Sequence, residues 1–289
     1  MVASGLTVGI LCPVAQGDFW KMIEGLVVID FPLRAKAKSV AAGIRGAWQV
    51  SLAWEAGFAA EVFKIAGIPR RLGQDERKLK KLLTHPLGFA VGPMEHRVRY
   101  YLSAVEALGI EPEKAEFFTP LEIGIEPVGS AVLLCPGSDF GASHEWSLEK
   151  WLEIGQKLLE SGRRVTVAGV DGGRRLGEVL AERLGDGVEF FHAAPLTGVL
   201  PLLAVHGLVI AADGSLPHLA AHAGATCVVL FGPNDPAWKR PLGKRHAIVR
   251  RHVECAPCFL TKCPLDMRCQ KELDVDRVWE VVREKLASV

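Results

Sequence analysis

The sequence lacks an excess of charge of either sign, and it lacks a long apolar run. Lysine and arginine together number 34 against 33 aspartates and glutamates, so no global basic field favours nucleic acid, and we expect no nucleic acid partner. The longest uncharged run, 195–212, is interrupted by Gly198, Pro201 and Gly207, which favours a helix and a buried strand over a membrane span. We therefore predict no transmembrane segment.

Basic residues are also absent ahead of the apolar residues 1–12, which resemble a first strand more than a signal peptide. We therefore expect a cytoplasmic protein whose thiols are mostly reduced. Neither G-x-x-x-x-G-K-[ST] nor G-x-G-x-x-G follows any expected strand, which argues against P-loop and dinucleotide-binding enzymes.

The 289 residues that are present, 49% of them hydrophobic, suffice for two folded domains. From residue 131 onward, short apolar runs alternate with helical patterns, which is typical of a parallel, doubly wound α/β sheet. Amphipathic helices are predicted over 148–160, with Ser147 as N-cap, and over 274–286, with Asp274 as N-cap. The expected strands cover 131–134, 165–168, 188–191, 208–210 and 227–231.

The first part of the chain is a second, less regular α/β unit. Its expected strands cover 6–12 and 26–29, and its expected helices cover 58–66 and 96–108. A stretch with three prolines and little periodicity, 111–129, predicts a linker. We therefore expect an N-terminal domain over 1–118 and a C-terminal domain over 125–289, with the boundary near residue 120.

The stretch 211–221 places an acid, a flexible turn and a histidine where an apolar strand gives way to a helix. Asp213 follows the strand, and Pro217 suits the first helical turn because it has no N–H to leave unpaired. We expect the residues from Gly214 to Leu216 to present free backbone N–H groups to an anion.

Small and polar residues follow the strands of the second domain, and parallel strands bring such loops to one edge. The loops are 135–141, 170–173, 213–218 and 232–236. Gly137 and Ser138 would approach a phosphate, while Asp213 or His218 would bond a sugar hydroxyl or a diphosphate oxygen. Two alternatives remain: Asp213 is a helix cap, or Ser138, Asp213 and His218 are a hydrolase triad, although Pro136 stands where a nucleophile elbow needs glycine.

Two further clusters are candidates for binding. Four cysteines in a C-x2-C-x4-C-x5-C pattern are spaced to hold a structural zinc or an iron–sulfur cluster, the alternative being a compact loop of reduced or partly disulfide-bonded thiols. They are Cys255, Cys258, Cys263 and Cys269. Seven basic residues between 64 and 81 form either a contact for an anionic acceptor or membrane surface, or a solvated face. Cys12, Cys135 and Cys227 are expected in the core.

Short motifs along nearly the whole chain resemble those of glycosyltransferase family 9, the lipopolysaccharide heptosyltransferases, and most closely its heptosyltransferase II branch. The motifs are G-I-P-R-R-L-G at 67–73, L-L-T-H-P at 82–86, H-R-V-R-Y-Y-L at 96–102, P-G-S at 136–138, L-T-G at 196–198, D-G-S-L-P-H-L-A-A at 213–221, F-G-P-N-D-P at 231–236 and C-A-P-C at 255–258.

This resemblance implies a GT-B architecture, two Rossmann-like domains with parallel sheets facing a cleft, with the sugar nucleotide held mainly by the C-terminal domain. It implies inverting transfer of heptose from ADP-heptose to the inner core, a lipid-linked saccharide acceptor, no cofactor for catalysis, and peripheral contact with the cytoplasmic face of the inner membrane. Carried over by position, the nucleotide-binding residues are Gly137, Ser138, His144, Asp213, Gly214, Ser215, Leu216 and His218.

The chain departs from the family pattern in three places. Asp213-Gly214-Ser215 exchanges the hydroxyl and the glycine of the usual D-[ST]-G, and His144 stands where a lysine is usual, which replaces a permanent charge by a group mostly neutral at pH 7. Since residues 6–12 match the family's second strand, the first β-α unit, which carries the proposed catalytic aspartate, is expected to be absent.

Asp18, after Gly17, copies the family's Gly-Asp turn and is the candidate base. Two other functions stay open. One is a catalytically impaired remnant that binds sugar nucleotides, and the other is a metal-stabilised interaction module built on the cysteines.

Overall fold

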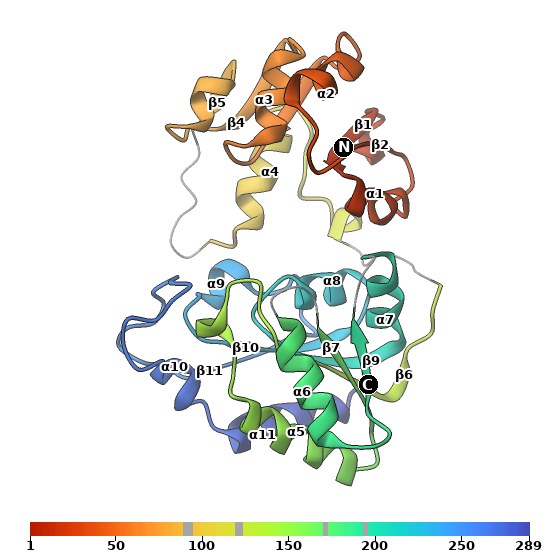
Figure 1. Ribbon diagram of the computed structural model, residues 1–289. Coiled ribbons are helices and arrows are strands. Elements are labelled where there is room, and N and C mark those ends of the chain that lie inside the picture. The colour runs from red at the N-terminus through yellow and green to blue at the C-terminus, as the bar shows by residue number, and fades with distance from the viewer. Residues whose placement is uncertain (89–94, 119–123, 170–172, 193–195) are drawn as a thin grey trace. The chain divides into compact units, whose positions relative to one another are not determined.

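The computed structural model describes residues 1–88, 95–118, 124–169, 173–192 and 196–289, which divide into two compact units, Met1–Phe117 and Phe118–Val289 (Figure 1). Among these residues, no helix combines the length and the apolar character needed to cross a bilayer.

The described strands of the N-terminal unit form two parallel sheets. The first pairs β1 (Val8–Pro13) with β2 (Leu26–Phe31), and the second has the order β3 (Val50–Ala53), β4 (Arg70–Gln74), β5 (His85–Leu87). The helices are α1 (Val14–Lys21), α2 (Ala37–Ile44), α3 (Phe58–Ile65) and α4 (Val98–Glu106), with short 3-10 turns at Val2–Ser4, Leu79–Leu82 and Ala115–Phe118.

The predicted strands 6–12 and 26–29 and the predicted helices 58–66 and 96–108 are each present within a few residues of their predicted bounds. The expected linker over 111–129 contains some regular structure in both of its described parts, 111–118 and 124–129. A 3-10 turn occupies Ala115–Phe118, and a strand begins at Val128, which pairs with His206 ahead of the apolar run that starts at Ala131. Residues 119–123 of that stretch lie outside the described part of the chain.

The C-terminal unit contains one six-stranded parallel sheet with the order β11-β10-β9-β6-β7-β8. Its strands are β6 (Val128–Cys135), β7 (Arg164–Gly169), β8 (Glu189–His192), β9 (His206–Ala212), β10 (Thr226–Phe231) and β11 (Ala247–Arg250). From the centre of the sheet, β6, β7 and β8 follow one another toward one edge, and β9, β10 and β11 follow one another toward the opposite edge. The doubly wound α/β sheet predicted from the sequence is confirmed, and its strand order reverses between β6 and β9.

Helices cover both faces of this sheet. The helices α5 (Leu148–Glu160), α6 (Arg174–Leu184) and α11 (Val275–Leu286) pack beside one another, and α7 (Val199–Val205) packs beside α8 (Leu216–His222). Two single-turn helices, α9 (Pro236–Lys239) and α10 (Arg268–Lys271), and the 3-10 turns Ala142–His144 and Leu196–Gly198 complete the described part of the unit.

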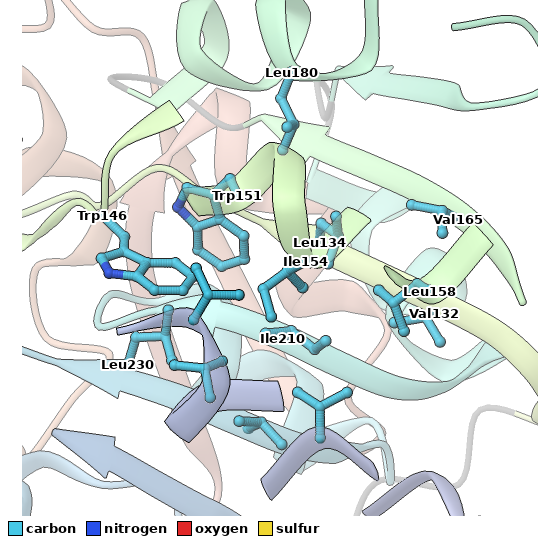
Figure 2. Close-up of a cluster of buried hydrophobic side chains, with 14 of the residues drawn as sticks. Val132, Leu134, Trp146, Trp151, Ile154, Leu158, Val165, Leu180, Ile210 and Leu230 are labelled. Atoms are coloured by element: carbon cyan, nitrogen blue, oxygen red, sulfur yellow. The ribbon is translucent and has the colours of Figure 1, made fainter. Parts of the chain in front are cut away.

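The helix predictions for α5 and α11 hold because their signals are local. The Ser147 hydroxyl accepts the N–H of Lys150, and the Asp274 carboxylate accepts the N–H of Arg277, so both predicted N-caps are confirmed. In Figure 2, Trp151, Ile154 and Leu158 of α5 point into the core beside strand residues such as Val132 and Ile210. Packing of this apolar stripe on the sheet fixes the helix.

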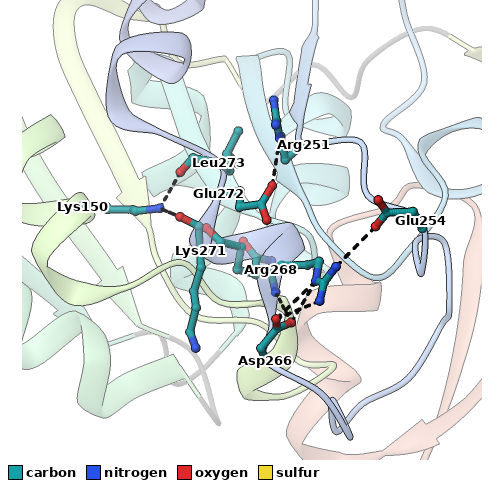
Figure 3. A network of polar contacts seen from close by, with 9 residues as sticks. Lys150, Arg251, Glu254, Asp266, Arg268, Lys271, Glu272 and Leu273 are labelled. Atoms are coloured by element: carbon teal, nitrogen blue, oxygen red, sulfur yellow. Dashed lines mark hydrogen bonds and ion pairs between the residues drawn. The ribbon is translucent and has the colours of Figure 1, made fainter.

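Lys150, on the polar side of α5, ties this helix to α10. Its ammonium group donates to the carbonyls of Gln270, Lys271 and Leu273 (Figure 3). These are carbonyls at and just beyond the end of α10, which have no intrahelical donor. The Trp146 indole N–H also donates to Leu273, at 2.8 Å, so the segment before α11 is held from two directions.

One histidine makes the stability of the C-terminal unit dependent on pH. His246 Nδ1 accepts the backbone N–H of Cys227 at the start of β10, and burial, with a smaller effect of Arg245, lowers the pKa of His246 to about 4. Between the ordinary value of 6.5 and about 4, the unfolded chain binds a proton that the folded chain does not. Stability contributed by neutral His246 is therefore lost as the pH falls through this range.

We predict that His246→Asn reduces this pH dependence, because an asparagine oxygen can accept the same N–H and does not titrate. Urea midpoints of the wild type should fall more between pH 7 and pH 4.5 than those of the variant. His252→Asn, at an exposed histidine, is the matched control and should keep the wild-type slope. An unchanged slope in His246→Asn would contradict the assignment.

Candidate functional site

The candidate site lies at the carboxyl ends of β6, β9 and β10, which are neighbours in the sheet. In open parallel sheets, ligands bind where the strand order reverses, because the loops there diverge and leave room between them. The described residues that follow these strands are 136–147, 213–215 and 232–235. The predicted fourth loop, 170–173, lies outside the described part of the chain except for Gly173.

Ser138 connects the loops on the two sides of the reversal. Its hydroxyl donates to the carbonyl of Asp213 at 2.5 Å and accepts the N–H of Phe140, and the side chain is buried. The backbone N–H of Ser138 donates to the carboxylate of Glu145 at 3.1 Å, and burial raises the pKa of Glu145. The hydroxyl and the backbone N–H of Ser138, which the sequence predicted to approach a phosphate, are therefore both hydrogen-bonded within the protein.

Asp213 is a buried carboxylate held from two other loops. Its side chain is 1% exposed, accepts a short hydrogen bond from the amide of Asn234, and lies 3.4 Å from Nδ1 of His144. That nitrogen makes no hydrogen bond with the described residues, so its contact with Asp213 is electrostatic and strengthens when the imidazole is protonated. His144 is equally buried, at 1% exposure.

This arrangement overturns two of the alternatives raised by the sequence. Asp213 does not cap α8, whose N-cap position is Ser215 without a side-chain cap. A hydrolase triad would need Ser138 to donate to His218 and Asp213 to orient that ring, but the Ser138 proton goes to a backbone carbonyl and the Asp213 carboxylate faces Asn234 and His144. His218 lies in α8 with its side chain exposed.

The expectation of free N–H groups from Gly214 to Leu216 is wrong at Ser215. Its N–H donates to the carboxylate of Asp139 at 2.7 Å, so an internal anion occupies the donor that was expected to face a ligand. Gly214 lies against the same carboxylate, since a Cβ there would be 3.4 Å from Asp139 Oδ2. Leu216, the first residue of α8, is buried.

Gly137 has a steric role that the sequence pattern left unspecified. A Cβ at Gly137 would lie 2.1 Å from the Cα of Gly173, so the loops after β6 and β7 approach backbone to backbone. Only glycine at both positions permits this approach.

The structure adds the side chains of Asn234 and Lys239 to the site, and the sequence pattern had pointed to neither of them. Lys239 Nζ lies 3.4 Å from Oδ1 of Asn234 and 4.2 Å from the ring centroid of Phe140, which brings a cation to the loops after β6 and β10. The F-G-P-N-D-P motif was the available signal, because it follows a buried strand. Lys239 itself, four residues into a short helix, carries no sequence signal of this kind.

The cysteine segment packs on these loops. The N–H groups of Cys258 and Phe259 donate to the carbonyl of Pro233, and the Ser143 hydroxyl donates to the carbonyl of Leu260. Figure 3 shows Arg268 between Asp266 and Glu254, which closes the segment that contains the first three cysteines of the cluster. The segment therefore reinforces the loop after β10.

The four clustered cysteines differ in exposure. Cys255 is exposed, Cys258 and Cys263 are half-buried, and Cys269 is buried. Burial, together with the negative charges of the other three thiolates, raises the pKa of Cys269 to about 11. Within the described ranges, no three His, Cys, Asp or Glu side chains are gathered closely enough to form a metal site. Cys12, Cys135 and Cys227 are buried, as predicted.

Asp18 does not lie in a turn after a strand. It belongs to α1, where its exposed carboxylate forms an ion pair of 2.9 Å with Lys21 one turn away. Gly17 and Asp18 therefore do not form the Gly-Asp turn of the family. Gly17 lies within α1 and packs against Asp30 of β2, where an added Cβ would lie 2.8 Å from the carboxylate.

Three basic side chains of the stretch 64–81 are bonded to other groups of the N-terminal unit. Lys64 donates to the carbonyl of Lys81, Arg71 donates to the carbonyls of Ile68 and Leu82, and Lys80 pairs with Asp75. The side chains of Arg70, Arg77 and Lys78 are exposed.

The chain is similar to known proteins in sequence and in structure. Over 151 residues the chain is 25% identical to lipooligosaccharide heptosyltransferase 2 of Haemophilus influenzae, a match that covers 50% of this chain and 44% of that protein. Over 141 residues it is 27% identical to lipopolysaccharide heptosyltransferase 1 of Pseudomonas aeruginosa, covering 48% of this chain and 39% of that protein. The chain thus matches less than half the length of these two relatives.

Among solved structures, E. coli ADP-heptose lipopolysaccharide heptosyltransferase II superposes with a TM-score of 0.80 at 17% identity, covering 97% of this chain and 89% of that one. This likeness shows the fold, and the predicted GT-B class is confirmed. The family model described as glycosyltransferase family 9 (heptosyltransferase) matches residues 94–268, more than half of the chain and all of the strand ends described above. The chain belongs to glycosyltransferase family 9.

Proposed function

We propose that the protein transfers heptose from ADP-heptose to the inner core of lipopolysaccharide, with inversion at the anomeric carbon. The supporting observation is the buried polar cluster at the reversal of strand order, in which Ser138, Asp213 and Asn234 lock three loops of a family 9 chain into one rigid edge. A preformed polar edge of this kind suits a ligand that carries both hydroxyl and phosphate groups.

The donor would be held by the C-terminal unit. The proposed lining consists of Gly137, Ser138, His144, Asp213, Gly214, Ser215, Leu216 and His218. To these we add Lys239, because departure of a nucleoside diphosphate requires positive charge near the leaving oxygen. His144 replaces the usual lysine, and the Lys239 ammonium beside Asn234 and Phe140 supplies a permanent charge to the same loops.

Transfer also needs a general base that takes the proton of the acceptor hydroxyl as that oxygen attacks the anomeric carbon. The likeness to the Gly-Asp turn that singled out Asp18 fails in the structure, so the proposal assigns this role to no described residue. The acceptor would be a lipid-linked saccharide at the cytoplasmic face of the inner membrane, with the exposed Arg70, Arg77 and Lys78 facing the anionic surface. The proposal includes no catalytic cofactor.

We predict that ADP-heptose at a hundred times its dissociation constant stabilises the protein by about 2.7 kcal/mol, which a thermal shift will detect. Transfer of heptose to a heptose-deficient lipopolysaccharide acceptor, followed by mass spectrometry, tests the chemistry. Asp18→Asn, at an exposed carboxylate on α1, should keep both the thermal shift and transfer. A shift without transfer by the wild type would identify a sugar-nucleotide-binding remnant, and no shift at saturation would refute the proposal.

We predict that Lys239→Gln raises the dissociation constant of ADP-heptose at least about tenfold, the equivalent of 1.4 kcal/mol, because a charge-assisted contact with phosphate is lost. Isothermal titration calorimetry measures this change. Lys244→Gln, at an exposed lysine just beyond α9, is the matched control and should bind as the wild type does. Equal affinities in the two variants would remove Lys239 from the site.

We also propose that the four clustered cysteines bind a structural zinc ion or an iron–sulfur cluster. The support is the C-x2-C-x4-C-x5-C spacing of these cysteines, whose first pair has the separation typical of metal ligands. Because the thiols are not gathered as a metal site in the described structure, binding would require the exposed segment around Cys255 to close on Cys269.

We predict that elemental analysis of the purified protein finds zinc or iron in at least a one-to-one ratio, and that Cys255→Ser/Cys258→Ser loses it. Cys12→Ser, at a cysteine outside the cluster, is the control for the loss of a thiol. A metal-free wild type would refute the metal site. Bound metal in a wild type that fails to bind ADP-heptose would favour a metal-stabilised interaction module.

A further inference from the structure

The segment between β11 and α10 exposes three large apolar side chains close together in sequence. Phe259 is 42% exposed, Leu260 44% and Leu265 64%, and we call residues 259–265 the apolar tip. The tip belongs to the blue loop beside α10 in Figure 1. Single exposed apolar side chains are ordinary on a protein surface, whereas a group of them indicates contact with a less polar partner.

The backbone of the apolar tip is anchored to the C-terminal unit. The N–H groups of Cys258 and Phe259 donate to the carbonyl of Pro233, each at 2.9 Å. The Ser143 hydroxyl donates to the carbonyl of Leu260 at 2.9 Å. The apolar side chains are therefore exposed from a backbone that is fixed at its first two residues.

The backbone conformation at both ends of the tip is unfavourable. Phe259 and Met267 each have a φ of 58°, and in the described part of the chain they are the two residues other than glycine with a positive φ. A side chain disfavours this conformation because its Cβ crowds the neighbouring carbonyl oxygen. Such conformations persist where packing imposes them, and they concentrate at functional sites.

The apolar tip lies in the most basic stretch of the C-terminal unit. Residues 236–271 contain nine lysines and arginines against two acids, and the rest of the chain is net acidic, because the whole has 34 basic and 33 acidic residues. Both acids, Glu254 and Asp266, form ion pairs with Arg268 (Figure 3). Lys262, inside the tip, and Lys244 are exposed to solvent.

We propose that the apolar tip inserts into the surface of a bilayer that contains anionic phospholipids. Its apolar side chains would enter the boundary between headgroups and acyl chains, and the basic side chains around them would contact lipid phosphates. Charge complementarity favours this occupant, since an apolar protein groove would have to desolvate the Lys262 ammonium in the middle of the tip.

This contact is separate from the one proposed for Arg70, Arg77 and Lys78 of the N-terminal unit. It also does not depend on the transfer reaction, because the tip contains none of the residues proposed to line the donor site. Its test therefore uses vesicles that carry neither ADP-heptose nor a saccharide acceptor, and a failure here leaves the proposed transferase activity unaffected.

Trp238 provides a reporter of insertion. Its ring centroid lies 5.2 Å from that of Phe259, and the side chain is half-buried. Brominated acyl chains quench tryptophan fluorescence on close approach, which adsorption to the headgroups alone does not bring about. Quenching by vesicles with brominated chains should be strong in the wild type and reduced in Trp238→Phe.

The binding test uses flotation of the full chain with vesicles. Binding to phosphatidylethanolamine with about a quarter phosphatidylglycerol should be at least about tenfold stronger than binding to phosphatidylcholine. Leu260→Ser/Leu265→Ser should weaken binding to the anionic vesicles at least about tenfold. Val14→Ser is the matched control, because Val14 is 54% exposed in a stretch without basic residues, and it should bind as the wild type does.

Lys262→Gln separates the part played by charge. It should weaken binding to the anionic vesicles about fivefold and leave binding to phosphatidylcholine unchanged. If the double leucine variant does not fold, Lys262→Gln and the quenching of the wild type decide.

Three results would overturn the proposal. Full binding by the double leucine variant, without quenching of the wild type, would show adsorption through basic residues alone. A dimer in sedimentation velocity that the double variant loses would assign the tip to a second copy of the chain. Absence of binding to every vesicle would refute insertion.

Discussion

The hydrogen bond from the Ser138 hydroxyl to the carbonyl of Asp213 bridges the point at which the strand order of the C-terminal sheet reverses. It fixes the backbone after β9, and with that backbone the direction of the Asp213 side chain. A carboxylate at 1% exposure must have donors or it destabilises the fold, so the loops that carry Asn234 and His144 are held against it. The geometry of the whole strand edge follows from this one constraint.

The same edge shows how a protein satisfies its own polar groups before a ligand arrives. Asp139 occupies the Ser215 N–H, and Glu145 occupies the Ser138 N–H, so two carboxylates of the loop after β6 stand where a donor phosphate was expected to find amides. The positive charge comes from Lys239, on the far side of Asn234. In our proposal an arriving diphosphate therefore exchanges with internal carboxylates, and its affinity depends on the difference between two sets of hydrogen bonds.

The two units differ in how completely the edges of their described strands are paired. In the C-terminal unit, six strands form one sheet whose inner edges are all paired, and helices cover both faces. In the N-terminal unit, the described strands are divided into sheets of two and three, and apolar side chains with an unpaired hydroxyl line the space beside both free edges. Parallel strands are most stable when they are buried and paired on both sides. Among the described residues, β1 and β3 are each paired on one side.

The sequence by itself determined the elements whose signals are local. The cap residues Ser147 and Asp274 and the apolar stripes that follow them define α5 and α11, and the short apolar runs define the strands of the doubly wound sheet. The tertiary structure alone decided which polar groups meet, because Asp139 with Ser215 and Asn234 with Asp213 are distant in sequence and are joined by strand order. The tertiary structure also excludes a Gly-Asp turn at Asp18. A two-residue motif does not fix its own backbone conformation, and here packing against Asp30 places Gly17 and Asp18 in a helix.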